Sequence, residues 1–304
     1  PRPQSPHRHL YERHLSIAPS PPKRHCRMKI PIPKITIAIP LYNAQEHIAQ
    51  TLQSVLNQTF TDFECIILND QSTDHSLSII KQFNDPRLHI ITHPQRLGFF
   101  GNWNACLNHL RGKYGKILPH DDLLEPTCLQ KQNDILDQHP HVTLVHSGRH
   151  IINPAGKNIT TRRPRETEGI QYQTQSLRHI VRSGTNPIGE PAAVLFRNAA
   201  AQQIGLFSET DIFSIDIDYW SRLLSVGPRY ILPEILCSFR VWPGSASVSL
   251  HGSQSQSMRT FYHRLNQQFP GHINPKDLRI GAVKSKLNEL ARGLFYRWMR
   301  LKSH

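Results

Sequence analysis

Two adjacent carboxylates, Asp121 and Asp122, follow the apolar pair Ile117-Leu118, which is typical of a buried strand. Neighbouring carboxylates repel each other unless a cation or hydrogen bonds compensate their charge, and their hard oxygen atoms suit Mg²⁺ or Mn²⁺. Such ions complete their coordination with phosphate oxygens and water. The pair therefore predicts a divalent-cation site for a phosphate-bearing ligand. The alternative is that the two residues cap the helix that we expect to begin at Pro126.

Two other side chains at predicted strand ends can recognise a nucleotide. Tyr42 stands just after Pro40, which ends a strand of alternating isoleucines, and its ring can stack on a flat base. Asp70 closes the next strand and can accept hydrogen bonds from a base or a ribose. Ligands of parallel sheets bind beyond the carboxyl ends of the strands, so we expect these side chains and the aspartate pair to face one ligand.

The elements that must position these residues alternate between strands and helices. The predicted strands are 35–39, 64–68, 88–92, 114–118 and 142–145, and the predicted helices are 45–57, 77–83, 100–110 and 126–139. This alternation predicts βαβ units and a mostly parallel sheet. Beyond residue 150 the pattern is irregular, with strands expected at 192–196 and 236–241 and a helix at 216–225.

Residues 35–76, ITIAIPLYNAQEHIAQTLQSVLNQTFTDFECIILNDQSTDHS, resemble the opening of family-2 glycosyltransferases. That family has Pro-x-Tyr-Asn after its first strand and Asp-Asp-Gly-Ser-Thr-Asp after its second. Here Asn69 and Gln71 replace the first Asp and the Gly of the second motif. The next family motif matches this chain at Arg96, Gly98, Asn104 and Gly112.

Three later motifs of the family also have counterparts, each with one departure. In LPHDD, Pro119 replaces the first Asp of the family's Asp-x-Asp motif. In SIDIDYWSRLL, Ile215 replaces a Glu and Asp216 is the retained acid. In SFRVWPGSAS, Arg240 is kept and Trp242 replaces a His. The resemblance covers about residues 34–247.

The resemblance implies an α/β fold of the GT-A type and an inverting transfer of a hexosyl or deoxyhexosyl group. The donor would be a nucleotide sugar, UDP- or dTDP-linked, and the acceptor a hydroxyl of a glycan or lipid-linked molecule in cell-surface polysaccharide synthesis. The implied site residues are Pro40, Tyr42 and Asp70 around the base, Arg96 and Asn104 in its surroundings, Asp121 with support from Asp122 on Mg²⁺ or Mn²⁺, and Asp216 as general base. Because Pro119 and Trp242 replace candidate metal-site side chains, a noncatalytic nucleotide-sugar-binding homologue is the alternative.

The net charge of +14 over 304 residues predicts anionic partners. Most of it lies at the two ends, because residues 1–27 carry a net +5 and residues 276–302 a net +6. A nucleic-acid-binding protein would place basic residues along a central groove instead, so we expect no nucleic-acid partner. Five scattered cysteines favour a reducing cytoplasm over a disulfide framework.

The sequence divides into three predicted parts: a disordered, proline-rich basic tail (1–33), the catalytic domain (34–247) and a helical basic extension (248–304). Met28 is the first methionine, and we expect the natural start there. From Ile280 onward, apolar residues recur every three or four positions beside several arginines and lysines. We therefore expect residues 276–302 to contact an anionic membrane, which would place the protein peripherally on the inner face of the cytoplasmic membrane. The alternative is that this stripe packs on the catalytic domain.

Overall fold

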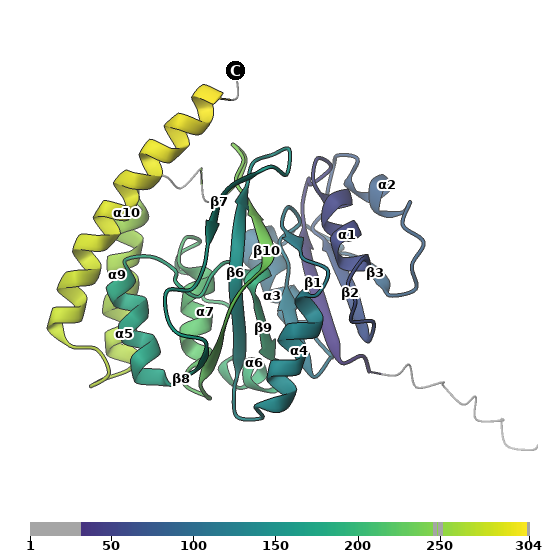
Figure 1. Cartoon of the computed structure of the whole chain (residues 1–304). Helices are drawn as coiled ribbons and strands as arrows, with labels where there is room; N and C mark the ends of the chain where they lie inside the picture. Colours follow the sequence, from purple (N-terminus) through teal and green to yellow (C-terminus); the bar gives the residue numbers. More distant parts are fainter. Residues whose placement is uncertain (1–31, 246–247, 249–251, 303–304) are drawn as a thin grey trace, which may run out of the picture. The chain divides into compact units, whose positions relative to one another are not determined.

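Runs of β-branched residues build the centre of a ten-stranded sheet (Figure 1). The computed structural model describes residues 32–245, 248 and 252–302, with side chains up to residue 295. The strands are β1 (Ile35–Leu41), β2 (Phe63–Asn69), β3 (Leu88–Thr92), β4 (Tyr114–Ile117), β5 (Leu123–Leu124), β6 (Leu144–Ile152), β7 (Asn158–Arg162), β8 (Gly169–Gln171), β9 (Val194–Arg197) and β10 (Arg229–Arg240).

The strand order is β3-β2-β1-β4-β9-β6-β10-β5, with β7 beside β6 and β8 beside β10. Strands β1 to β4 are parallel to their neighbours among themselves, and β6 is parallel to β10. Strand β9 lies antiparallel to both β4 and β6, so these two point the same way. Six strands therefore end at one edge of the sheet, which confirms the mostly parallel α/β arrangement.

Helices cover both faces of the sheet. They are α1 (Ile48–Leu56), α2 (Ser76–Ile80), α3 (Gly98–Asn108), α4 (Cys128–Gln138), α5 (Gln173–Ser183), α6 (Asn198–Ile204), α7 (Ile215–Leu223), α9 (Gln254–Gln268) and α10 (Pro275–Lys302), with a short 3₁₀ turn at Pro191–Ala193. Because side chains alternate along a strand, Ile37 of β1 joins the core beneath α1 and α4, whereas Ala38 joins the core beneath α3, α5, α7 and α9.

The second half of the chain contains more regular structure than its sequence pattern predicts. The predicted strand 236–241 is the end of the long strand β10, whose register shifts near Pro233 and Ile235 interrupt the alternation of side chains. Helix α9 lies in the predicted helical extension 248–304. Its residues Met258, Phe261 and Tyr262 are buried in the same core as α7. The predicted tail lies, up to residue 31, outside the described residues, and so does Met28.

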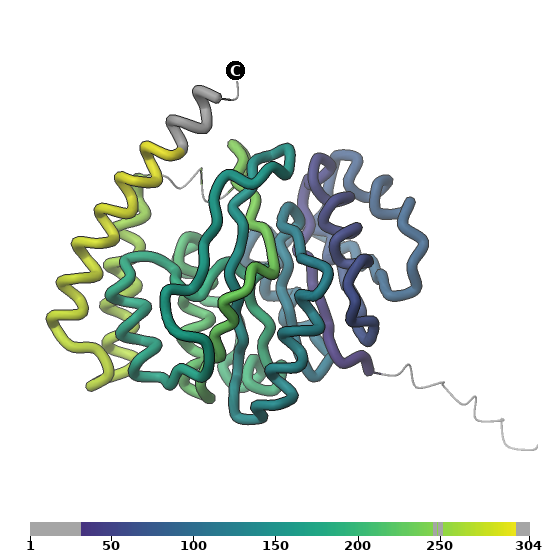
Figure 2. The backbone as a smooth tube through the Cα atoms, in the orientation of Figure 1, coloured from purple at the N-terminus to yellow at the C-terminus, as the bar shows by residue number. Residues whose placement is uncertain are grey.

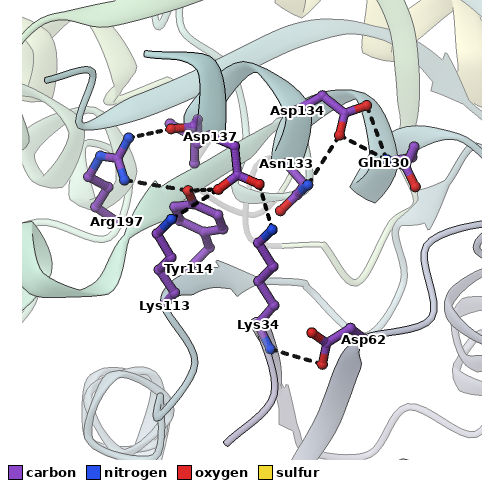
Figure 3. A network of polar contacts seen from close by, with 10 residues as sticks. Lys34, Asp62, Lys113, Tyr114, Gln130, Asn133, Asp134, Asp137 and Arg197 are labelled. Atoms are coloured by element: carbon purple, nitrogen blue, oxygen red, sulfur yellow. Dashed lines mark hydrogen bonds and ion pairs between the residues drawn. The ribbon is translucent and has the colours of Figure 1, made fainter. Parts of the chain in front are cut away.

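A polar network at the amino-terminal edge of the sheet ties β1, β4 and α4 together (Figure 3). The Asp137 carboxylate of α4 accepts hydrogen bonds from Lys34 Nζ (2.5 Å), Lys113 Nζ (3.0 Å) and Tyr114 Oη (2.8 Å). Burial alone would raise the pKa of Asp137, but these donors hold it well below its usual value. The network fixes the far end of the strands and leaves the opposite edge for a ligand.

Helix α10 packs beside α5 and α9. Figure 2 shows it in yellow, far from the purple strand β1. None of the helices in the described ranges is both long enough and apolar enough to cross a membrane. Four cysteines of the described chain, Cys65, Cys106, Cys128 and Cys237, are buried free thiols.

Candidate active site

The carboxyl ends of β1, β2, β4, β6 and β10 border a cavity of about 600 Å³, which we call the donor cavity. Its wall contains residues that follow β1, β2, β4 and β10, and it is completed by α3, α7, α9 and α10. Of the predicted site residues, it brings together Pro40, Tyr42, Asp70, Arg96, Asp121 and Asp216. Residues as far as 176 positions apart in the sequence, Pro40 and Asp216, thus line one cavity.

The predicted nucleotide residues form a connected group at one part of the wall. The Arg96 guanidinium lies 3.9 Å from the centre of the Tyr42 ring, a cation–π contact. The Asp70 carboxylate accepts hydrogen bonds from the backbone N–H groups of Leu97 (2.5 Å) and Gly98 (2.9 Å). Asp70 therefore anchors the start of α3, and with it the backbone that carries Arg96.

The predicted residue Asn104 is buried outside the wall of the donor cavity. Its side chain accepts a hydrogen bond from the backbone N–H of Phe207 at 2.8 Å, which fastens the loop before α7 to α3. The asparagine of α3 that lines the wall is Asn102, which donates to the carbonyl of Leu68 at 3.1 Å and contacts His93. Asn102 and Asn104 are two residues apart on α3 and therefore point to different faces of the helix, so only Asn102 lines the cavity.

Asp121 lies in the wall beside the tryptophan that replaces the family's histidine. The indole Nε1–H of Trp242 donates to Asp121 Oδ2 at 2.7 Å, and Arg240 Nε donates to the Asp121 carbonyl at 2.8 Å. An indole N–H is only a donor, so Trp242 orients the carboxylate but offers no lone pair to a metal.

Asp122 is fully buried and does not line the donor cavity. Its Oδ1 accepts the backbone N–H of Arg240 at 3.0 Å, and its Oδ2 has no hydrogen-bond partner among the described residues. Burial, and then the adjacent Asp121, raise the pKa of Asp122 well above its usual value. Asp122 thus contacts β10, and its role as a metal ligand stays a prediction. Helix α4 begins at Cys128 without a side-chain cap, so the capping alternative is wrong.

The side chains available as metal ligands suit a cation that binds together with a diphosphate. The described residues contain no cluster of three or more His, Cys, Asp or Glu side chains placed to hold a metal ion. Mg²⁺, however, commonly binds through one or two carboxylates together with substrate phosphates and water. Asp121 supplies one carboxylate in the cavity wall, which meets that requirement only when phosphate oxygens are present.

Asp216 lies in the first turn of α7 with its carboxylate in the cavity wall. The carboxylate accepts hydrogen bonds from its neighbour's backbone, Ile217 N–H (2.7 Å), and from the Asn186 amide (2.9 Å). Burial, and then the charge of Glu190, raise the pKa of Asp216 to about 7, although both hydrogen bonds oppose this rise. A carboxyl group with such a pKa can accept a proton at neutral pH.

Asp218 occupies a different face of α7, as its two-residue offset predicts. Its Oδ2 accepts a hydrogen bond from Arg222 Nε at 3.0 Å, and its side chain is absent from the cavity wall. Only one of the two carboxylates therefore lines the donor cavity.

Sequence reasoning missed a polar loop before β9 that surrounds Asp216. Glu190 forms an ion pair with Arg149 of β6, and both lie in the cavity wall. Asn186 holds the loop by accepting the N–H groups of Ile188 and Gly189. Gly189 has φ +119°, and an added Cβ would lie 3.2 Å from an Arg149 nitrogen. The one signal in the sequence was the Gly-Glu-Pro turn ahead of the predicted strand 192–196.

Comparisons with known proteins agree with this geometry. Residues 36–205 match the model of glycosyl transferase family 2. An uncharacterized glycosyltransferase of Haemophilus influenzae is 26% identical over 246 residues, covering 77% of this chain and 70% of that protein.

Two solved structures share the fold. S. aureus TarS in complex with UDP-GlcNAc has a TM-score of 0.61 at 18% identity, covering 77% of this chain and 66% of that one. The mannosyltransferase PcManGT from Pyrobaculum calidifontis, in complex with GDP-Man and Mn²⁺, has a TM-score of 0.58 at 18% identity, with 90% and 82% covered. At this identity they establish the GT-A fold alone, whereas the family model spans more than half of the chain. The chain belongs to glycosyltransferase family 2, and it is a glycosyltransferase.

Proposed function

We propose that the protein transfers a hexosyl or deoxyhexosyl group, with inversion, from a UDP- or dTDP-linked donor to a hydroxyl of a glycan or lipid-linked acceptor. The observation that carries this proposal is the Asp216 carboxylate, held by Asn186 in the wall of the cavity that Tyr42 and Asp70 also line. Its pKa of about 7 suits a general base at neutral pH.

Each side chain has a defined task in this reaction. Tyr42 and Arg96 hold the nucleotide base, and Asp70 keeps the start of α3 in place beside it. Asp216 accepts the proton of the acceptor hydroxyl as that oxygen bonds to the anomeric carbon. The bond to the diphosphate breaks on the opposite face, and the nucleoside diphosphate leaves with the bonding electrons.

Asp121 would hold Mg²⁺ or Mn²⁺ together with the donor diphosphate. When bound, the cation neutralises the negative charge that the leaving diphosphate gains. Trp242 keeps the Asp121 carboxylate oriented through its indole N–H. Asp122 remains a candidate ligand only if it leaves its buried contact with Arg240.

Asp121→Ala is expected to abolish the effect of Mn²⁺ on UDP binding. In the wild-type protein, Mn²⁺ should strengthen UDP binding by about tenfold or more, which corresponds to ~1.4 kcal/mol. Isothermal titration calorimetry with Mn²⁺ and with a chelator measures both states. Asp134→Ala, on α4 and outside the cavity wall, is the matched control and should keep the effect. A Mn²⁺ effect that survives in Asp121→Ala would contradict this assignment.

Asp216→Asn should lower the rate of transfer by roughly 10²–10⁴-fold while donor binding persists, because the amide keeps the shape but cannot accept the proton. Asp218→Asn is the control two residues along the same helix, and it should lose far less activity. Release of nucleoside diphosphate with a responsive donor and acceptor measures both variants. Equal losses in the two variants would show that Asp216 is not the base.

The pH dependence of kcat/KM tests Asp216 through Glu190, the neighbouring charge that raises its pKa. Since Asp216 acts when ionised, kcat/KM should rise as the pH rises through about 7. Glu190→Gln removes a negative charge that raises the pKa of Asp216, and it releases Arg149 from its ion pair. The acidic limb should therefore move to lower pH, with a higher kcat/KM than wild type at pH 6. Glu209→Gln, an exposed carboxylate outside the cavity wall, should leave the limb in place.

We also propose that α10 attaches the protein to an anionic membrane surface, on the cytoplasmic side that the cysteine pattern predicts. The support is an outward apolar stripe, in which Val283, Leu287, Leu290 and Leu294 are 62%, 59%, 56% and 67% exposed. Apolar stripes of surface helices normally face the core, so this exposure is unusual. It also argues against the alternative that the stripe packs on the catalytic domain.

The inward face of α10 is small and polar. Gly281 is buried against α5, where an added Cβ would lie 2.5 Å from the Val181 carbonyl oxygen. Asp277 accepts a hydrogen bond from Arg178 at 3.0 Å, and Glu289 accepts one from Ser255 at 2.9 Å. Both acidic residues of segment 276–302 are thus buried, which leaves basic residues on its exposed surface and favours anionic lipids.

Leu290→Gln with Leu294→Gln should weaken binding to phosphatidylglycerol vesicles by about tenfold or more, because two side chains can no longer enter the apolar layer. Cosedimentation at low salt measures the loss. The control pair is Leu206→Gln with Val226→Gln, two exposed apolar residues outside α10 that should leave binding unchanged. The membrane proposal is contradicted if the wild-type protein does not bind these vesicles, or if the Leu290→Gln, Leu294→Gln variant binds them as well as the wild type.

A further inference from the structure

A second cavity, of about 1220 Å³, opens between the β7–β8 loop, α5 and α10. We name it the arginine groove. Its cationic lining consists of Arg149, Arg162, Arg163, Arg165, Arg178, Arg182 and Lys284. Among the residues that line it, Glu166 is the single carboxylate.

The carboxylates around the arginine groove do not balance its cations. Glu166 Oε1 accepts a hydrogen bond at 2.5 Å from Arg229, which is itself fully buried. Asp277 lies beneath the groove, where it pairs with both Arg178 (3.0 Å) and Arg182 (3.6 Å). One carboxylate thus serves two guanidinium groups, and Glu190 pairs with Arg149. These three carboxylates stand against the seven cations of the lining and the buried Arg229, so an excess of positive charge remains at the groove.

The arginine groove adjoins the donor cavity. Both are lined by Arg149, Thr160, Arg162, Thr185, Asn186 and Asn288. Asn186 is the residue that donates to the Asp216 carboxylate at 2.9 Å. A molecule in the groove would therefore lie next to Asn186, which holds the proposed base, and away from Tyr42, Asp70 and Arg96, which line only the donor cavity.

One wall of the groove also belongs to the exposed stripe of α10. Leu287 lines the groove and is 59% exposed, next in the stripe to Val283 and Leu290. The polar groove thus opens beside the surface that we propose to contact lipid.

We propose that the arginine groove binds phosphate groups of the sugar acceptor, close to the hydroxyl that Asp216 deprotonates; this inference rests on the proposed function. Guanidinium groups bind phosphate oxygens in pairs of parallel hydrogen bonds, and here they come from the β7–β8 loop and from α5. A phosphate on a lipid carrier and a phosphate on a free glycan present the same oxygens to these groups.

The test uses the full-length protein with saturating UDP, so that the donor cavity is occupied, and excess Mg²⁺. Inorganic pyrophosphate is the probe, and calorimetry measures its affinity. Arg165→Gln combined with Lys284→Gln removes two exposed cations from opposite elements, the β7–β8 loop and α10. Both residues line the groove, and neither lines the donor cavity. Pyrophosphate should bind the wild-type protein, and its affinity should fall by about tenfold or more in the double variant.

Arg279→Gln is the matched control, because Arg279 is exposed on α10 but does not line the groove. It should bind pyrophosphate like the wild type, and the UDP affinity of all variants should be unchanged. The proposal is overturned if pyrophosphate does not bind beside UDP, or if the control loses as much affinity as the double variant. It is also overturned if citrate, an anion with carboxylates only, binds as tightly as pyrophosphate.

Farnesyl diphosphate distinguishes the two sources of phosphate. Tighter binding than pyrophosphate, with the gain lost in Leu287→Gln, supports a lipid-linked acceptor. Equal binding of the two probes supports a phosphate-bearing soluble glycan.

Donor turnover separates this inference from the proposed function. If nucleotide sugars are turned over but pyrophosphate fails the test, only the groove assignment falls. If pyrophosphate passes but no UDP- or dTDP-linked donor is turned over, the proposed function fails and the acceptor assignment falls with it.

Discussion

The buried guanidinium of Arg240 holds together the segments on which the donor cavity depends. It donates to the Asp121 carbonyl (2.8 Å), to the Gln50 side chain of α1 (2.7 Å) and to two carbonyls in the turn between β6 and β7. Its own backbone N–H donates to Asp122. Because the Arg240 side chain is fully buried, its N–H groups would be costly to leave unpaired away from water. The end of β10 therefore fixes the loop that carries Asp121, and with it the proposed place of the diphosphate.

The orientation of α10 links the catalytic and surface features of the protein. Its inward face is anchored by Asp277, Gly281 and Glu289, which fit against α5 and α9 through small size and ion pairs rather than through apolar burial. The apolar stripe of Val283, Leu287, Leu290 and Leu294 remains outside, and Lys284 and Leu287 border the arginine groove. The packing of α10 on α5 and α9 thus places a basic groove, the proposed base and an apolar surface next to one another.

Much of this arrangement follows from the sequence. The alternation of strands and helices up to residue 145 predicts a parallel sheet. Short apolar runs separated by helices are typical of parallel strands, which helices cover on both faces of the sheet. Tyr42, Asp70 and Asp121 each follow a strand, so they share one edge whatever the packing details. The two-residue offset between Asp216 and Asp218 likewise predicts that only one of them reaches the cavity.

Only the tertiary structure decided which of the remaining polar side chains take part. Glu190 and Arg149 are 41 residues apart and meet because β6 and the loop before β9 converge, which no local pattern reports. Asp122 follows Asp121 directly, yet burial against β10 removes it from the cavity wall. The sequence by itself determined the fold class, the edge of the sheet that carries the site and the candidate base. Side-chain burial and long-range ion pairs, which depend on how helices settle on the sheet, determined the pKa of that base, the outward stripe of α10 and the arginine groove.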